Sequence, residues 1–328
     1  MSYHAWYHSS LITHNFNKSM YHAPVLLTEA IAALHIQPEG TYVDATFGGG
    51  GHAREILKQL RGKGRLFAFD QDEDAQRNAE QPEFTGYPTF LFIHSNFRYL
   101  KRQLRAEVVR PGTVHGILAD LGVSSHQLDT AERGFSYRFE AELDMRMNTL
   151  DGPRAAEVLN TYTAEELQRV FSEYGEVRNA RTLAQACVQS RSQKPFRTTG
   201  ELVELCEKNL LGERWRYLSQ VFQALRMEVN DEIGALRDFL TDAFEMLAPG
   251  GRLAIITFHS IEDRLVKNYL KTGNLEGVVK QDFYGNIDRP FTVITKKPIE
   301  AGVTELQQNS RSRSARLRVA EKRMMNDK

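Results

Sequence analysis

Four consecutive glycines, Gly48 to Gly51, follow the strand-like segment TYVDATF at 41–47. With Ala53 they match the Gly-x-Gly-x-x-Ala pattern of a nucleotide-binding turn, in which glycines let the backbone approach a ligand at a helix N-terminus. Asp70 lies 22 residues after Gly48, at the end of a second apolar run. A carboxylate at that place is suited to bind ribose hydroxyls. The spacing therefore predicts a nucleoside-containing cofactor.

Two cofactor classes fit such a turn. A nicotinamide dinucleotide would bring a pyrophosphate to the helix N-terminus, whereas S-adenosylmethionine would bring a cationic sulfonium and an ammonium. Asp44 and Asp120 end the first and fourth apolar runs, where they would repel a pyrophosphate and attract a cation. Together with Asp70 they favour S-adenosylmethionine. A nicotinamide-dependent oxidoreductase remains the alternative from another enzyme class.

These acids lie close together only if a parallel sheet aligns the strands that carry them. Short apolar runs occupy 41–47, 66–69, 89–93, 114–121 and 253–258. Helical stretches separate the first four runs, and strands alternating with helices predict an α/β fold with a Rossmann-like, mostly parallel sheet. At the sheet edge, 278–283 and 291–297 are expected to form an antiparallel hairpin.

A long interval interrupts this alternation. Nearly 130 residues separate Gly122 from Gly250, where a parallel crossover needs roughly a dozen. Capping-box signals at Thr163 and Thr198 predict helices there, and an apolar stripe over 229–247 predicts the crossover helix itself. We therefore expect an all-helical domain at 132–218, inserted into a domain made of 20–131 and 219–328. Residues 1–19 are expected to be a disordered leader.

The composition narrows the class of protein. Lysine plus arginine and aspartate plus glutamate number 42 each, so any nucleic-acid surface must be a local basic patch. Cys187 and Cys206 are the only cysteines, which excludes a disulfide framework and a cysteine-rich zinc site. No apolar run reaches the roughly 18 residues of a membrane span. A cytoplasmic protein with no metal site and no membrane partner is expected.

Seven segments, in order and at suitable spacing, resemble one family. They are YHAPVLLTEAI, DATFGGGGHA, DLGVSSHQLD, ERGFSY, LDMRM, APGGRLAIITFHSIEDRLVK and NSRSRSARLRVAEK. From Tyr21 to Lys322 the chain resembles the ribosomal RNA small-subunit methyltransferase H family, the 16S rRNA (cytosine-N4)-methyltransferases. The resemblance implies a class I S-adenosylmethionine-dependent methyltransferase with an inserted helical substrate-recognition domain. It further implies methylation of the N4 amine of one cytosine in the decoding region.

The resemblance also places the cofactor site. The implied cofactor-binding residues are Gly50, Gly51, His52, Asp70, Phe97, Asp120 and Gln127. His52 is expected to be neutral beside a helix N-terminus, and Phe97 to stack near the adenine. Two positions depart from the family pattern: Gly49 stands where a bulky residue is common, and His126 where a proline often precedes the glutamine. Neither departure removes a matched cofactor residue, although the second bears on local rigidity.

Methylation of an exocyclic amine needs groups that accept its protons. The lone pair of the cytosine amine is delocalised into the ring, so acceptors and in-line positioning supply the acceleration. Many amino-methyltransferases use an Asp/Asn-Pro-Pro-aromatic motif after the fourth strand, but DLGVSS stands here. Asp120 is therefore the candidate catalytic acceptor in addition to its cofactor role. The candidate substrate-binding residues are Ser124, His259, Ser260, Glu262, Arg311 and Arg313.

The expected partner is 16S rRNA within the small ribosomal subunit, bound by a monomer or homodimer. Arg311, Arg313, Arg316 and Arg318 are expected to form a phosphate-contacting strip. If the RSRS stretch is extended, Arg311 and Arg313 project to the same side. An RNA-binding assembly factor that keeps the fold without catalysis is the remaining alternative.

Overall fold

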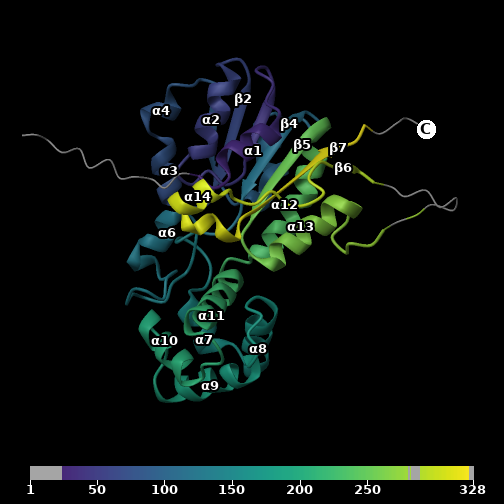
Figure 1. Ribbon diagram of the computed structural model, residues 1–328. Coiled ribbons are helices and arrows are strands. Elements are labelled where there is room, and N and C mark those ends of the chain that lie inside the picture. Colours follow the sequence, from purple (N-terminus) through teal and green to yellow (C-terminus); the bar gives the residue numbers. More distant parts are fainter. Residues whose placement is uncertain (1–23, 280, 282–288, 325–328) are drawn as a thin grey trace, which may run out of the picture.

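The computed structural model describes residues 24–279, 281 and 289–324. The leader expected at 1–19 lies outside these residues. A sheet covered by helices forms one part of the molecule, and a group of helices forms the other (Figure 1). None of the helices within the described ranges has the length and apolar character needed to cross a membrane.

Seven strands form a single sheet. They are β1 (Thr41–Asp44), β2 (Arg65–Asp70), β3 (Phe90–His94), β4 (Val114–Asp120), β5 (Leu247–Thr257), β6 (Phe291–Val293) and β7 (Arg316–Lys322). Their order is β3-β2-β1-β4-β5-β7-β6. The first five strands are parallel, and β7 runs antiparallel to both β5 and β6. The predicted mostly parallel sheet is confirmed. Its strand order reverses at β1 and β4, whose carboxyl ends border the crevice where such sheets bind ligands.

The described antiparallel edge consists of β6 and β7, which pair in the register Phe291↔Lys322 to Val293↔Ala320. The hairpin predicted between 278–283 and 291–297 lies partly outside the described residues. Residues 278 and 279 are not in a strand, and 280, 282 and 283 lie outside the described residues. β7 lies between β5 and β6 because its alternating side chains, including Leu317 and Val319, are buried against the sheet.

Helices cover both faces of the sheet. On one face lie α1 (Leu27–Leu34), α2 (Gly51–Leu60) and α3 (Glu73–Ala79), and on the other lie α5 (Leu100–Ala106), α12 (Glu232–Met246) and α13 (Ser260–Thr272). Successive strand residues point to opposite faces. Tyr42 and Leu118 therefore join the core under α1 and α2, while Val43 and Ile117 join the core under α5 and α12.

Several short helices complete the connections. They are α4 (Pro82–Thr85), α6 (Ser125–Asp129) and α14 (Val303–Gln308), with the 3₁₀ helices η1 (Phe97–Tyr99), η2 (Ala131–Arg133) and η3 (Ser310–Ser314). Among them, η1 and α6 follow the carboxyl ends of β3 and β4 and thus border the crevice.

Five helices between β4 and α12 have a hydrophobic core of their own. They are α7 (Ala155–Thr161), α8 (Ala164–Glu173), α9 (Ala180–Gln193), α10 (Thr199–Lys208) and α11 (Arg214–Val229). Thr163 and Thr198 form the predicted capping boxes of α8 and α10. The boundary expected at 218 falls within α11, and Leu225 still belongs to this second core. The helical unit therefore ends near Val229 rather than at 218.

The predicted crossover helix begins later than its apolar stripe. Asn230 and Asp231 separate α11 from α12, and Asp231 has a φ of 45°. The side chain of Asn230 accepts a hydrogen bond from the Met147 amide at 2.7 Å and donates one to the Met145 oxygen at 2.8 Å. The start of the insertion and its return to the sheet are thereby joined at one point beside the crevice.

Candidate functional site

The glycine turn lies between the end of β1 and the start of α2. Gly50 caps α2 with a φ of 72°, a left-handed conformation that favours glycine. A Cβ at Gly50 would clash with the ring of Phe84, and one at Gly51 would clash with Pro24. The turn is therefore restricted to glycine at both positions, because side chains pack directly against its backbone.

Asp70 joins this turn to the end of β2. Its Oδ2 accepts a hydrogen bond from the Gly48 amide at 2.8 Å, and its Oδ1 accepts one from the Asp72 amide at 3.0 Å. Burial raises the pKa of Asp70 to about 6, although these backbone hydrogen bonds act to lower it. A carboxylate oxygen accepts more than one hydrogen bond, so this geometry is compatible with additional bonds from a ribose.

Asp44 and Asp120 bring two further buried carboxyl groups to the same edge. Burial raises the pKa of Asp44 to about 7. Burial, followed by the charges of Asp44 and Glu262, raises the pKa of Asp120 well above its usual range. Within the described part of the chain, Asp44 Oδ2 and Asp120 Oδ1 are buried without a hydrogen-bond partner. Buried carboxylates need a compensating charge, so this edge fits a cationic cofactor and disfavours a pyrophosphate.

His52 does not supply that charge. Its Nε2 lies 3.2 Å from the Val25 backbone oxygen, which can only accept, so Nε2 carries the proton. Its Nδ1 lies 4.0 Å from Asp120 Oδ2. Burial lowers the pKa of His52 to about 4. The imidazole is therefore neutral near pH 7, as the sequence predicts, but desolvation is the main cause.

Gln127 and Ser124 fix the position of α6. The Gln127 side chain donates to Asp72 Oδ2 at 2.6 Å and accepts from the Ser124 amide at 2.9 Å. The Ser124 hydroxyl accepts from the Gln127 amide at 3.1 Å. Beside them, His126 Nε2 lies 3.0 Å from Asp74 Oδ2. His126, at the position where the family often has a proline, thus holds α6 through a side-chain contact to α3.

Phe97 lines a cavity at the ends of β1, β3 and β4, as Thr46 and Gly122 do. Its ring packs edge-on against Phe239, with the centroids 5.3 Å apart. Gln71 and Asn96 line the same cavity, and Asn96 donates to Gln71 Oε1 at 2.8 Å. Our sequence analysis missed these two amides as site residues. Their signal was their position, one or two residues after the ends of β2 and β3.

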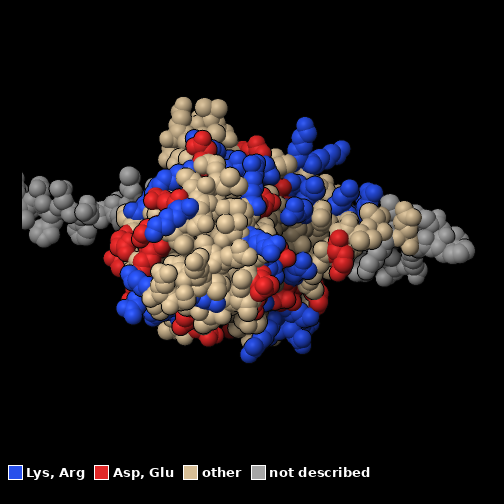
Figure 2. All heavy atoms as spheres, turned by 90° about the horizontal axis from the view of Figure 1, so that it is seen from below, with Lys and Arg blue, Asp and Glu red and all other residues tan. Residues whose placement is uncertain are grey.

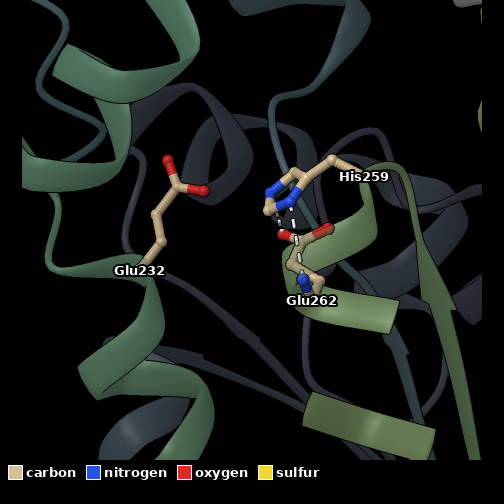
Figure 3. Close-up of side chains that lie close together, drawn as sticks. All are labelled: Glu232, His259 and Glu262. Atoms are coloured by element: carbon tan, nitrogen blue, oxygen red, sulfur yellow. Dashed lines mark hydrogen bonds and ion pairs between the residues drawn. The ribbon is translucent and has the colours of Figure 1, made fainter. Parts of the chain in front are cut away.

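The cavity continues to two carboxylates on the other side of the crevice, Glu232 and Glu262. Glu232 begins α12, and Glu262 lies in the first turn of α13, close to His259 (Figure 3). Sequence analysis identified His259 and Glu262 but missed Glu232. Its only local signal was an acidic residue at the start of the crossover helix, which is usual for any helix. Ser260 points elsewhere, because its hydroxyl donates to Glu176 at 3.3 Å.

Of the four arginines predicted to form a phosphate-contacting strip, Arg313 and Arg316 are exposed and Arg318 is buried. Residues 310–314 are a 3₁₀ helix, so the extended arrangement expected for Arg311 and Arg313 is wrong. Arg311 pairs with Asp129, whereas Arg313 is exposed. Arg318 is buried in β7 and donates to both oxygens of Asp263, at 2.6 and 2.9 Å. Arg318 therefore holds β7 against α13 and is not free for a phosphate.

Charges on the face of the inserted helices are mixed. Seen from that side, lysines and arginines lie among aspartates and glutamates rather than forming one continuous basic surface (Figure 2). This agrees with the equal totals of basic and acidic residues. Contacts with a polyanion on this face would depend on individual basic side chains.

Comparison with known proteins connects this crevice to one family. The sequence model of the MraW methylase family matches residues 19–323. The ribosomal RNA small subunit methyltransferase H of Bacteroides fragilis is 52% identical over 307 residues, which cover 93% of this chain and 99% of that protein. The proteins of the same name from Cytophaga hutchinsonii and Flavobacterium johnsoniae are 52% and 50% identical, and the matches cover 92% of this chain and 100% and 98% of those proteins. The chain therefore belongs to the MraW methylase family, with a class I methyltransferase fold and S-adenosylmethionine as its cofactor.

Proposed function

We propose that this protein methylates the N4 amine of one cytosine in the decoding region of 16S rRNA, within the small ribosomal subunit. The observation that carries the proposal is the 52% identity, over 99% of its length, to a relative named for small-subunit ribosomal RNA. The seven motifs that resemble cytosine-N4 methyltransferases support the choice of base. Such a reaction belongs in the cytoplasm, where ribosomal subunits are found.

The crevice residues would hold the cofactor in a defined way. The backbone at Gly50 and Gly51 would face it at the start of α2, and Asp70 would bind the ribose. Phe97 would lie against the adenine, and Asp120 and His52 would lie near the amino-acid end, with Gln127 holding α6 in place. S-adenosylmethionine supplies a methyl group bound to a cationic sulfur. The two unpartnered buried oxygens of Asp44 and Asp120 support this orientation.

The target amine would enter beside Asp120. A neutral amine is a poor nucleophile in a conjugated ring, and hydrogen-bond acceptors at its protons return electron density to the nitrogen. Asp120 stands at the end of β4, next to the cavity that Glu262 lines. The hydroxyls of Ser124 and Ser260 are already engaged with Gln127 and Glu176. Carboxylates are therefore better placed than these serines to face the amine.

The test is methyl transfer to small subunits purified from a strain that lacks the enzyme. Radiolabelled S-adenosylmethionine should label 16S rRNA, and nucleoside mass spectrometry should find N4-methylcytidine at one position. Label on another atom or on another RNA would contradict the proposal. Cofactor binding without any transfer to the subunits would instead favour the non-catalytic assembly factor.

A further inference from the structure

The cavity beside the cofactor crevice contains a polar trio whose role in methyl transfer has not been assigned. The candidate ligand atoms of Glu232, His259 and Glu262 all lie within 4.8 Å of one another. Figure 3 shows Glu232 on one side and the His259–Glu262 pair on the other, with the carboxylate of Glu232 directed toward that pair. The cavity that both carboxylates line also reaches Phe97 and Gly122. The trio is therefore open to the place where the cofactor and the target base would meet.

The trio is almost entirely removed from solvent. Glu262 is 3% exposed, and the side chains of Glu232 and His259 are each 10% exposed. Carboxylates are rarely buried to this extent unless they have partners. Arg226 is the partner of Glu232, and His259 lies beside Glu262. Both carboxylates also line one cavity, and a carboxylate oxygen accepts more than one hydrogen bond, so a ligand there could donate to both.

A divalent metal ion is the first ligand to consider, and the partners of the trio argue against it. Arg226 donates to both oxygens of Glu232, at 2.6 and 2.8 Å. His259 Nδ1 accepts from the Glu262 amide at 3.5 Å, which leaves the proton on Nε2, 3.2 Å from Glu262 Oε1. His259 Nε2 is a buried atom without a hydrogen-bond partner among the described residues. A metal ion is therefore disfavoured only by Arg226, whose guanidinium would lie beside the ion and repel it. A neutral hydrogen-bond donor fits these surroundings better.

The target amine is such a donor. Resting on the proposed cytosine substrate, we propose that Glu232 and Glu262 form an acceptor pair for its two N–H bonds, and that Glu262 receives the proton it loses. Cytosine presents an N4 amine as a donor, and a carboxylate is its natural acceptor. Uracil presents an oxygen at that position, which two carboxylates would repel. The acceptor pair thus both activates the amine and selects cytosine over uracil.

The step balances without another reactant. The nitrogen lone pair forms the bond to the methyl carbon, and the electron pair of the carbon–sulfur bond remains on sulfur. The nitrogen then carries an excess proton, which passes to the carboxylate of Glu262. Burial acts to raise the pKa of Glu262, but the charges and hydrogen bonds of His259, Arg226 and the Phe258 amide outweigh it, and the pKa lies below its usual value. Glu262 is therefore ionised and ready to accept before the reaction.

Arg226 and His259 act as positioning residues. The bidentate contact of Arg226 fixes the Glu232 carboxylate, and its charge offsets that of Glu232 inside the protein. His259, the residue before α13, lies beside Glu262, with its Nε2 3.2 Å from Glu262 Oε1. Each acceptor thus has a fixed direction, which in-line attack requires.

The experiment compares Glu232→Gln and Glu262→Gln with Glu245→Gln. Glu245 lies on the same helix as Glu232 but is half-exposed and pairs with Lys101, so its variant controls for the chemical change. Three quantities are measured: cofactor affinity by calorimetry, the single-turnover rate on unmethylated small subunits, and the relative affinity for free cytidine and uridine by saturation-transfer NMR. Wild-type protein should prefer cytidine by about tenfold or more, the scale of one good base-edge contact.

Both cavity variants should lose that preference, because glutamine offers a donor to the uracil oxygen. Glu262→Gln should lower the single-turnover rate by about 100-fold or more, as loss of a proton acceptor does. Cofactor affinity should stay within about twofold, and Glu245→Gln should match wild type throughout. If Glu262→Gln does not fold, Glu232→Gln alone still tests the selection of cytosine.

A wild-type cytidine preference in both cavity variants, with unchanged rates, would overturn the inference. So would activity that a chelator abolishes and Mn²⁺ restores, because the trio would then be a metal site. The proposed function is tested separately by the position of the methyl group in the wild-type product. If wild type forms N4-methylcytidine while the variants behave normally, the inference fails and the function stands.

Discussion

Acidification is expected to weaken S-adenosylmethionine binding, because the crevice acids must ionise to pair with a cation. Burial raises the pKa of Asp44 to about 7 and that of Asp70 to about 6. Asp44 is then about half ionised at pH 7 and about 1% ionised at pH 5. If only the ionised form binds, affinity falls about 50-fold over this interval, or about 2.3 kcal/mol. Asp70 adds up to about tenfold by the same reasoning.

Calorimetry at pH 5, 6 and 7 measures this dependence. These pH values lie below the range in which the α-amino group of the cofactor titrates, so the charge of the cofactor stays constant. Binding should release protons, since the cofactor lowers carboxyl pKa values that burial had raised. Asp44→Asn removes the contribution of Asp44 and should leave a shallower dependence, carried by the other two raised carboxyl groups, Asp70 and Asp120. Equal affinity at pH 5 and pH 7 in folded wild-type protein would refute the electrostatic reasoning. An Asp44→Asn variant with the full wild-type slope would refute the assignment to Asp44.

The same acids link pH to the stability of the ligand-free protein. A carboxyl whose pKa is raised by folding binds its proton more tightly in the folded state than in the unfolded state. Its contribution to the free energy of unfolding is therefore greatest at low pH and declines between about pH 4 and pH 7 for Asp44. Melting temperatures should show S-adenosylmethionine stabilising the protein more at pH 7 than at pH 5.

Four further predictions concern Asp70, the inserted helices and two C-terminal arginines. Asp70→Ala should weaken cofactor binding by about 1.5–3 kcal/mol in calorimetry, and unchanged affinity in folded protein would exclude the ribose contact. Replacing 149–229 with a short linker should preserve some cofactor binding and abolish rRNA methylation. A short linker can span the gap because Met147 and Asn230, at its two ends, are hydrogen-bonded to each other. Full methylation would show that the insertion does not recognise RNA. Arg318→Gln should lower the free energy of unfolding by about 3 kcal/mol, because it removes both short hydrogen bonds to Asp263 and leaves only the 3.4 Å contact with Arg316. Arg313→Gln should leave stability unchanged and reduce the salt dependence of RNA binding, and an unaltered slope would place phosphate contacts elsewhere.

The cofactor side of the crevice was predictable because one rule governs it. Parallel strands bring their carboxyl ends to the same edge, so strand-ending acids such as Asp44 and Asp120 must approach one another. The glycine turn was predictable for a different reason: its backbone conformation depends on the local sequence alone. Recognising the strands was therefore sufficient to bring these residues together.

Other features depend on contacts between distant segments and escaped prediction. Glu232 resembles any acidic residue at a helix start, and only the return of the chain from the insertion brings it opposite Glu262. Arg318 was expected in a phosphate-contacting strip, because its partner Asp263 is 55 residues away and no local signal joins the two. The alternation of Leu317 and Val319 was the available sign of a strand, and the surrounding arginines concealed it.

The two sides of the crevice differ in how their negative charge is balanced, and this difference accounts for the direction in which the reactants would bind. Asp44 and Asp120 each keep a buried oxygen that has no partner among the residues the structure describes, so that side gains from a ligand that carries positive charge. Glu232 and Glu262 already have Arg226 and His259 beside them, so that side gains little from a second cation but retains acceptor sites for neutral donors. In the proposed reaction a sulfonium would therefore be stabilised at the ends of β1 and β4, and an uncharged amine between α12 and α13. The methyl group would then pass from the cofactor beside Asp44 and Asp120 to the amine between α12 and α13. The carboxylate of Glu262 would accept the proton that the amine releases.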